Sequence, residues 1–315
     1  MTTENRTWIY SSAKNLLRNM VLICSVSLAM VSCQNDQLAP QDEFDTPLVI
    51  STGVGMYPAR SVVTGNTLDN GSSIGVTVVD KNGSKYETRD YNNVRYTASK
   101  GSDGSQKWET TTPIMLSGET GTLYAYYPYR ADIDVENISI DLKNDEVVDW
   151  MYATEITSLD NQNAHAQIKL NRALAKLKVS LVKGNFVGSG NVASISLTSG
   201  GAATAAVLNA RTGQLRNVSS AGTKLVYPVN ETLGDEPLEL NLLFVPTSQT
   251  STVKIDVVVD NRNYTATAST TIKPEAGQSY NYTLIQNSTK LEMSQVTVTP
   301  WHENPNETLE TERVK

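Results

Sequence analysis

Apolar residues alternate with polar residues along most of the chain, starting near residue 46. The clearest runs are Ile74, Val76 and Val78; Ile138, Ile140 and Leu142; Leu238, Leu240, Leu242 and Phe244; and Val253, Ile255, Val257 and Val259. A period of two places every second side chain on one face of a β-strand, so that one face is buried while the other meets water. No long stretch shows the 3.6-residue stripe of an amphipathic helix. The pattern therefore predicts an all-β chain.

Turn-forming residues separate the predicted strands. One example is Asp80-Lys81-Asn82-Gly83, in which Asn-Gly supplies the positive φ angles that a tight hairpin requires. Similar Asn-Gly and Gly-Asn pairs, together with prolines, recur between the apolar runs. Short strands separated by turns are typical of β-sandwiches with Greek-key connections, and we expect that architecture here.

One predicted strand changes its buried face along its length. In residues 168–181 the apolar positions are even up to Leu170 and odd from Leu177 onwards. A shift of one residue moves the buried set of side chains to the opposite face of a strand. We therefore expect a bulge or a bend between Arg172 and Ala175.

The N-terminal segment has the pattern of an export signal. Lys14 and Arg18 precede an uncharged, apolar stretch over residues 20–32. This stretch of 13 residues is shorter than the ~20 apolar residues that span a bilayer. We therefore expect a cleaved signal peptide over residues 1–32 and not a permanent membrane anchor.

Cys33 follows this apolar stretch directly. Ala29 and Ser32 are small enough for a peptidase to close over the backbone, and Ser32-Cys33 fits the lipobox of bacterial lipoproteins. In a lipobox the cysteine after the cut is lipidated, which would tie the chain to outer-membrane lipid. A buried Cys33 or a disulfide with Cys24 is the alternative, but Cys24 lies in the segment that would be removed. We therefore predict that Cys33 is lipidated.

Residues 34–315 suit two domains at roughly 100–200 residues per domain. The polar, turn-prone residues 160–163 precede the strand that changes its face, which favours a junction near residues 161–164. The expected segments are a lipidated tether or pro-segment with the first strand (33–60), an N-terminal β-sandwich (61–163) and a C-terminal β-sandwich with a polar tail (164–315).

Charge and composition narrow the function. The formal net charge is −7 and the isoelectric point is about 5.0, whereas a nucleic-acid partner requires clustered Lys and Arg. His165 and His302 are the only histidines, so zinc binding and histidine-based catalysis are poorly supplied. Acidic pairs such as Asp132 and Asp134 are typical of solvated loop carboxylates. We therefore expect no enzyme, no cofactor and no nucleic-acid partner.

Seven motifs occur in a characteristic order along the chain. They are the lipobox, Tyr57-Pro58-Ala59-Arg60, Ser73-Ile74-Gly75-Val76, Leu123-Tyr124-Ala125-Tyr126-Tyr127-Pro128-Tyr129, Asp149-Trp150-Met151-Tyr152-Ala153, Ala173-Leu174-Ala175-Lys176-Leu177 and Ala276-Gly277-Gln278-Ser279-Tyr280-Asn281-Tyr282-Thr283-Leu284. Their order and spacing resemble the fimbrillin family of Bacteroidales-type pilins. Two positions depart from the family pattern, since Arg172 stands where a histidine is frequent and Trp150 where a phenylalanine is frequent.

This resemblance implies a fold and a function. The implied fold is two transthyretin-like antiparallel β-sandwich domains in tandem. The implied function is that of a structural subunit (pilin) of cell-surface fimbriae, exported as an outer-membrane lipoprotein, polymerised with other fimbrial subunits and supporting adhesion. The alternative is a monomeric surface lipoprotein that binds glycans or host proteins, with Tyr124, Tyr126, Tyr127 and Tyr129 as a sugar-stacking platform.

The resemblance also implies proteolytic maturation. In the family an arginine-specific protease removes the N-terminal segment together with its first strand. The matching bond in this chain joins Arg60 to Ser61. The ordinary alternative is an exposed loop arginine with no such role.

The last alternating run, from Leu291 to Val298, has two interpretations. Its apolar side chains at Leu291, Met293, Val296 and Val298 alternate well enough to enter the groove that the strand at 47–56 would vacate in a neighbouring subunit. Such a contact joins subunits head to tail into a fibre. Alternatively, the run completes the second domain and the charged tail after Trp301 is disordered.

Overall fold

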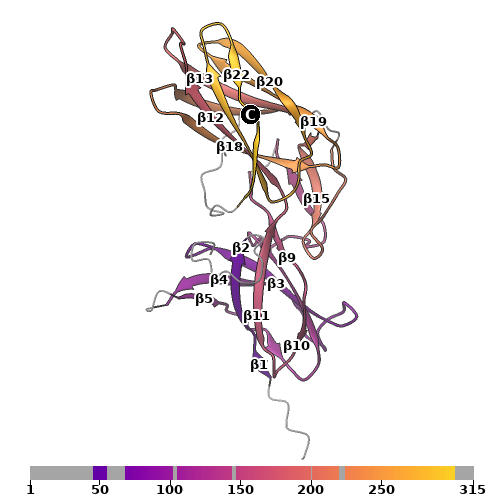
Figure 1. Ribbon diagram of the computed structural model, residues 1–315. Helices are drawn as coiled ribbons and strands as arrows, with labels where there is room; N and C mark the ends of the chain where they lie inside the picture. Colours follow the sequence, from indigo (N-terminus) through magenta and orange to yellow (C-terminus); the bar gives the residue numbers. More distant parts are fainter. Residues whose placement is uncertain are drawn as a thin grey trace, which may run out of the picture. The chain divides into compact units, whose positions relative to one another are not determined.

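The computed structural model describes residues 45–54, 68–101, 105–143, 147–199, 201–219 and 224–301. Within these ranges the chain forms 23 β-strands and no helix, which confirms the all-β prediction (Figure 1). The contacts of the chain do not divide residues 44–315 further, although the strands belong to several separate sheets.

Eight strands from the first part of the described chain form one sheet. Their order is β2-β11-β9-β7-β3-β4-β5, and β10 pairs with β7. Their bounds are β2 Val49–Val54, β3 Ser73–Asp80, β4 Tyr91–Lys100, β5 Gln106–Glu109, β7 Gly121–Tyr127, β9 Met151–Ala153, β10 Ile156–Leu159 and β11 His165–Arg172. A separate two-stranded ladder joins β1 (Thr46–Pro47) to β6 (Met115–Leu116).

The period-two pattern explains the core of this sheet. Ile74, Val76 and Val78 of the central strand β3 are buried in it, as their alternation predicted. The strands at the two ends of the order, β2 and β5, contact each other, and Thr52 Oγ1 donates a hydrogen bond to Gln106 Oε1 at 3.2 Å. The sheet is therefore curled towards a barrel.

The rest of the chain forms three further sheets. The six-stranded sheet has the order β14-β18-β12-β21-β22, with β23 also on β21, and the four-stranded sheet has the order β17-β13-β19-β20. The three-stranded sheet has the order β16-β15-β8. Their bounds are β8 Ile138–Asp141, β12 Ala175–Lys183, β13 Asn191–Ser199, β14 Ala202–Ala203, β15 Ala205–Asn209, β16 Gln214–Arg216, β17 Leu225–Thr232, β18 Leu238–Pro246, β19 Ser251–Val259, β20 Arg262–Ile272, β21 Gln278–Gln286, β22 Leu291–Met293 and β23 Thr297–Pro300.

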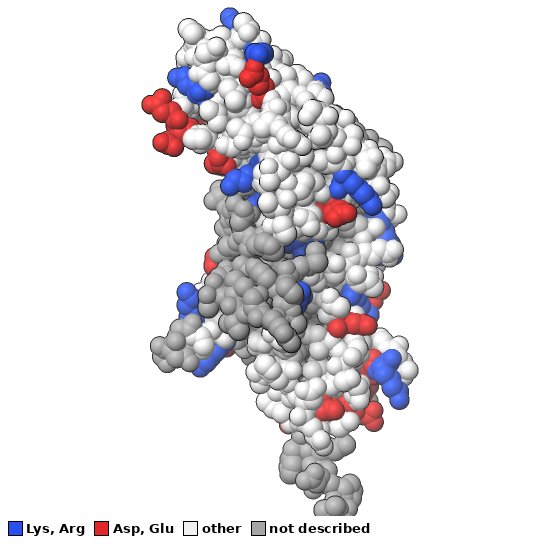
Figure 2. All heavy atoms as spheres, in the orientation of Figure 1, with Lys and Arg blue, Asp and Glu red and all other residues white. Residues whose placement is uncertain are grey.

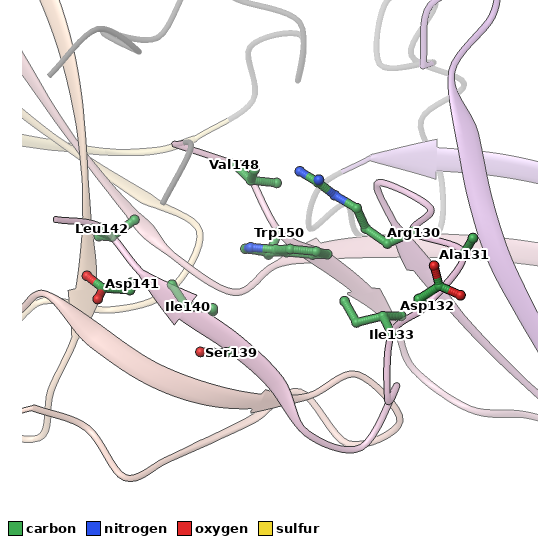
Figure 3. A pocket seen from close by; sticks show the side chains of 10 residues that line it. All are labelled: Arg130, Ala131, Asp132, Ile133, Ser139, Ile140, Asp141, Leu142, Val148 and Trp150. Carbon is green, nitrogen blue, oxygen red and sulfur yellow. The ribbon is translucent and has the colours of Figure 1, made fainter. Parts of the chain in front are cut away.

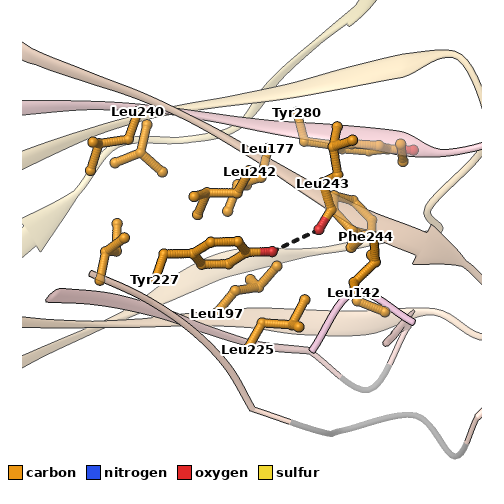
Figure 4. Close-up of a cluster of buried hydrophobic side chains, with 14 of the residues drawn as sticks. Leu142, Leu177, Leu197, Leu225, Tyr227, Leu240, Leu242, Leu243, Phe244 and Tyr280 are labelled. Carbon is orange, nitrogen blue, oxygen red and sulfur yellow. Dashed lines mark hydrogen bonds between the residues drawn. The ribbon is translucent and has the colours of Figure 1, made fainter. Parts of the chain in front are cut away.

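A second apolar core lies between the six-stranded and four-stranded sheets. Leu177 and Leu242 of the first of these sheets cluster with Leu197 and Tyr227 of the second (Figure 4). The Tyr227 hydroxyl donates a hydrogen bond to the Leu243 carbonyl at 2.9 Å, which satisfies the one polar atom of this ring inside the core. Two sheets packed face to face in this way form a β-sandwich.

Two pairs of strands run parallel, so the expectation of antiparallel sheets is wrong at these places. Strand β2 is parallel to β11, and β12 is parallel to β21. The other pairs of strands described above are antiparallel. Alternation along one strand reveals which side chains are buried but not the direction of the neighbouring strand, so the sequence pattern could not separate the two cases.

The chain passes from the first sheet to the six-stranded sheet at Ala173 and Leu174. Here β11 ends at Arg172 and β12 begins at Ala175, with a bend between them, which confirms the expected break. The buried positions are even in β11, whereas the buried apolar positions are odd in β12, because the two strands face different cores. A division of the chain at 161–164 would therefore remove β11 from the first sheet.

The segment between β7 and β9 belongs to the second core. Its strand β8 pairs with β15, and Ile138, Ile140 and Leu142 are buried in the same cluster as the sandwich residues. A segment that leaves the first sheet and returns to it thus supplies part of the second core. The two parts of the described chain are interlocked at this point.

Candidate functional site

Strand β2 and the residue directly before it contribute a row of apolar side chains to the first core. Leu48, Ile50 and Val54 are each at most 6% exposed, whereas Val49 is 56% exposed. Burying an aliphatic side chain contributes about 1.5–3 kcal/mol, so the three together contribute roughly 5–9 kcal/mol. This is comparable with the net stability of a whole domain, which is about 5–15 kcal/mol. Loss of the strand would therefore expose an apolar groove that is costly to leave empty.

Backbone pairing holds the first strand on one side. Strand β2 lies parallel to β11, from Val49 opposite His165 to Val54 opposite Leu170 (Figure 1). On its other side β2 meets β5 through side chains, and the described residues contain no second ladder for it. An end strand with one ladder can be exchanged without breaking the interior of its sheet.

A charged clamp fixes the start of this strand. Arg89 forms an ion pair with Asp45 and donates a second hydrogen bond to the Met115 carbonyl at 3.2 Å. Hydrogen bonds to Tyr91 and then to Asp45 raise the pKa of Arg89 further above its ordinary value. The Leu48 amide also donates to the Ile114 carbonyl at 2.8 Å. The segment that enters β2 is therefore held at several points.

The C-terminal strands β22 and β23 both pair with β21 of their own sheet. Met293 lies opposite Leu284 and Thr297 opposite Asn281, so a step of four residues faces a step of three. One extra residue is a β-bulge, which turns the strand over. The alternation expected from Leu291 to Val298 is therefore interrupted, which explains why its apolar positions change from odd to even.

The side chains of this run are buried to different degrees. Leu291 is buried, while Met293 and Val296 are half-buried against the second core. Val298 is 48% exposed. In this structure the run completes its own sheet, as one of the two interpretations expected. Donation of the run to a neighbouring subunit stays a prediction.

Three of the predicted site residues lie outside the described residues. They are Cys33, Arg60 and Ser61. The described chain ends at Val54 before the predicted cleavage bond and resumes at Leu68 after it. Lipidation of Cys33 and cleavage after Arg60 therefore stay predictions.

The tyrosines proposed as a sugar platform do not form an open row of rings. Tyr126 is buried, and its hydroxyl donates to Asn93 Oδ1 at 2.9 Å. Burial raises the pKa of Tyr126 above its ordinary value. The Arg211 guanidinium lies 5.4 Å from the ring centre of Tyr124, at a distance typical of a cation–π contact. These rings pack within the protein or against a cation.

A pocket of about 470 Å³ lies on the segment between β7 and β9 (Figure 3). Trp150 occupies its centre, with Asp132 on one side and Asp141 on the other. Asp134, the other half of the predicted acidic pair, binds the Glu136 amide and the Asn137 side chain, and these hydrogen bonds, that of Asn137 first, lower its pKa. The pair Asp132 and Asp134 is therefore not set for joint acid and base catalysis.

The sequence also contains one serine motif at the start of β3. Gly71-Ser72-Ser73-Ile74-Gly75 has the Gly-x-Ser-x-Gly spacing of a nucleophile elbow. That motif requires a turn from strand to helix, whereas Ser73 begins strand β3. Its hydroxyl lies 3.0 Å from Thr97 Oγ1 and accepts a hydrogen bond from Arg95 Nε. The spacing alone thus gives no catalytic serine.

Charged groups form no obvious site in the described part of the chain. There, no three His, Cys, Asp or Glu side chains are grouped so that they could hold a metal ion. No helix in the described ranges is long and apolar enough to cross a membrane. Acidic and basic side chains are scattered over the face seen in Figure 2, with no single dominant patch. The strands at the two ends of the described chain are therefore the strongest candidate site.

Comparison with known proteins identifies a matching family and similar solved structures. The sequence profile of a family described as fimbrillin-like matches residues 60–301. No curated protein matches the sequence. Crystal structures of candidate cell adhesion proteins from Bacteroides uniformis and Bacteroides ovatus match with TM-scores of 0.63 and 0.64 at 19% and 18% identity. The match covers 82% of this chain in both cases, and 99% and 98% of the other chains. These structures share the fold of this chain.

Proposed function

Because this chain belongs to the fimbrillin-like family, we propose that it is a structural subunit of cell-surface fimbriae that supports adhesion. It is exported as a lipoprotein through Cys33, matured by cleavage between Arg60 and Ser61, and polymerised with other fimbrial subunits by strand exchange. Two transthyretin-like domains, joined where the chain changes sheets, form part of this proposal. The observation that carries it is the attachment of β2, an end strand with one ladder, together with the burial of Ile50 and Val54 in it and of Leu48 directly before it.

Cleavage after Arg60 would separate β1 and β2 from the rest of the chain. The covalent connection would be lost, while the ladder to β11 and the buried Leu48, Ile50 and Val54 would remain. Departure of the strand would open one edge of β11 and the apolar positions beside it. An incoming strand would regain both the main-chain hydrogen bonds and the apolar contacts, and this gain would drive assembly.

The run from Leu291 to Val298 is the proposed donor. In the separate subunit it already adopts extended structure in β22 and β23. To fill the groove it would have to leave β21 and present its apolar side chains in alternation, which requires removal of the bulge between Met293 and Thr297. Each subunit would then donate one strand and accept another, and the chain of contacts would extend without closing.

Cleavage of the purified chain by an arginine-specific protease tests this proposal. We expect a new N-terminus at Ser61, followed by fibres in electron micrographs and detergent-resistant ladders on gels. Arg60→Ala should stay uncleaved and monomeric. Arg262→Ala, which removes an exposed arginine elsewhere, is the matched control and should behave as the wild type.

A different result would contradict the proposal. If the cleaved chain stays monomeric at all concentrations, polymerisation through β2 is wrong. A cleaved monomer that binds immobilised glycans or host proteins would instead support the alternative of a monomeric surface binder.

A further inference from the structure

A buried ion pair marks the place where the chain changes sheets. Arg172, the last residue of β11, donates from Nε to Asp149 Oδ2 at 2.9 Å. The two side chains are 1% and 2% exposed. A buried charge requires partners for its remaining polar atoms. For Arg172 one of these partners comes from the far end of the described chain.

Trp301 supplies that partner. The Trp301 carbonyl accepts a hydrogen bond from Arg172 Nη1 at 2.8 Å, and the Arg172 guanidinium carbon lies 4.0 Å from the centre of the Trp301 ring. Lys176 Nζ lies 5.2 Å from the same centre. Two cations therefore face one indole, and Arg172 holds both the main chain and the ring of one residue.

Trp301 is the main side-chain anchor of the last described strand. It is 3% exposed, whereas all four residues of β23 are exposed and Val296 is half-buried. Apart from Trp301, β23 is held by its ladder to β21 and by the Asn281 side chain, whose amide donates to the Thr297 carbonyl at 3.0 Å and to Thr299 Oγ1 at 3.1 Å. Removal of the Trp301 side chain from the core would thus take away the one buried side chain of segment 294–301 and loosen this segment, which would keep only its hydrogen bonds and the half-buried Val296.

The buried environment of the Trp301 side chain, its seat, leaves one polar atom unsatisfied. Its indole N–H is buried and has no hydrogen-bond acceptor among the described residues. A buried donor without an acceptor opposes burial. The contacts that hold Trp301 are therefore opposed by its indole N–H, which would gain a hydrogen bond to water on exposure. This lowers the free-energy cost of releasing the residue.

We propose that Trp301 is a releasable latch that keeps the C-terminal strand in its own sheet until the first strand has been removed. The connection runs through β11, because β2 pairs with β11 up to Leu170 and Arg172 holds Trp301 two positions further along. Loss of β2 would loosen the end of β11 and would weaken the contacts of Arg172 with the carbonyl and the ring of Trp301. The role of the latch in assembly rests on the proposed strand donation, but the latch itself does not.

Hydrogen exchange of the uncleaved chain tests the latch. In Trp301→Ala the amides of segment 294–301 should exchange about tenfold faster or more, because the side-chain anchor is gone. Trp301→Phe keeps a ring for Arg172 and should give a smaller increase. Val298→Ala changes an exposed residue of the same strand and should match the wild type. Equal exchange in Trp301→Ala and Val298→Ala would overturn the latch.

Global unfolding would be recognised by faster exchange in β12 and β19 as well. Should Trp301→Ala unfold, Trp301→Phe decides, since this variant still fills the seat. Faster exchange confined to 294–301 supports the latch, and unchanged exchange overturns it. The chain that begins at Ser61 tests the coupling: its segment 294–301 should exchange faster than in the uncleaved chain, and an unchanged rate would contradict the coupling.

Fibre formation separates the latch from the proposed function. In the cleaved chain, Trp301→Ala should shorten the lag before fibres appear, because the donor strand is already free. A free segment 294–301 in a chain that never forms fibres would leave the latch standing and contradict the proposed donation.

Discussion

Strand β2 near the start of the described chain and strand β23 at its end are attached to their sheets in different ways. Strand β2 and the residue before it, Leu48, place three apolar side chains in the first core, and a charged clamp holds the start of this segment. Strand β23 places none of its own side chains in a core and depends on its ladder, on the Asn281 side chain and on Trp301. Removal of β2 therefore leaves an apolar groove, whereas removal of β23 leaves mainly an open edge of β21.

This difference gives the two ends of the subunit different roles. Once β2 has left, any strand with matching apolar positions that fills the groove lowers the free energy of the subunit. The segment that contains β23 loses little apolar contact when it leaves its sheet, apart from the contacts of the buried Trp301 ring. The first end is thus suited to accept a strand and the last end to donate one.

Deletion of each end strand should show the largest difference. Removal of residues 1–60 should destabilise the first core by roughly 5–9 kcal/mol, the contribution of three buried aliphatic side chains. Removal of residues 297–315 should cost at most about 3–5 kcal/mol, the range for loss of one buried tryptophan. Denaturant unfolding at low protein concentration measures both, and a larger loss from the C-terminal deletion would reverse the comparison.

A pair of single substitutions in β2 sharpens the account of its burial. Ile50→Ala should destabilise the uncleaved chain by about 2–5 kcal/mol, because it leaves a cavity in the first core. Val49→Ala removes an exposed side chain of the same strand and should stay within about 0.5 kcal/mol of the wild type. Equal effects in thermal or chemical unfolding would show that β2 is not held by its buried face.

The ion pairs at the two ends should give the smallest difference. Asp45→Asn weakens the clamp to Arg89 and should cost roughly 0.5–1 kcal/mol, a low value because both side chains are about a third exposed. Glu292→Gln weakens the exposed pair with Lys290 and should have almost no effect. Chemical unfolding at low and high salt checks both substitutions, and a stronger effect at Glu292 would count against the clamp.

The sequence predicted the strands better than their partners. The alternating residues Ile74, Val76 and Val78 are buried as predicted, although the opposite face of β3 is buried too, and the change of parity near Arg172 correctly indicated a break. The parallel pairing of β2 with β11 could not be predicted, because alternation has the same period in parallel and antiparallel strands. Strand β11 was expected in the second part of the chain for another reason, because the polar, turn-prone residues 160–163 directly before it have the composition of a linker.

The sequence contains one indication of the Trp301 site, namely a cation at a buried position of β11. Arg172 continues the even positions of Ile168 and Leu170, and a cation on a buried face requires a carboxylate and further acceptors. Asp149 and Trp301 meet this need, but they lie 23 and 129 positions away along the chain. Only the folded chain shows which residues meet.

A peptide that refills the first-strand groove tests the central claim most directly. The peptide DTPLVISTGV, residues 45–54, is added to the chain that begins at Ser61, and fibre formation is followed by light scattering and electron microscopy. The account predicts that the peptide prevents or shortens fibres, while a scrambled peptide of the same composition has no effect. Fibres of normal length in the presence of saturating peptide would contradict the account.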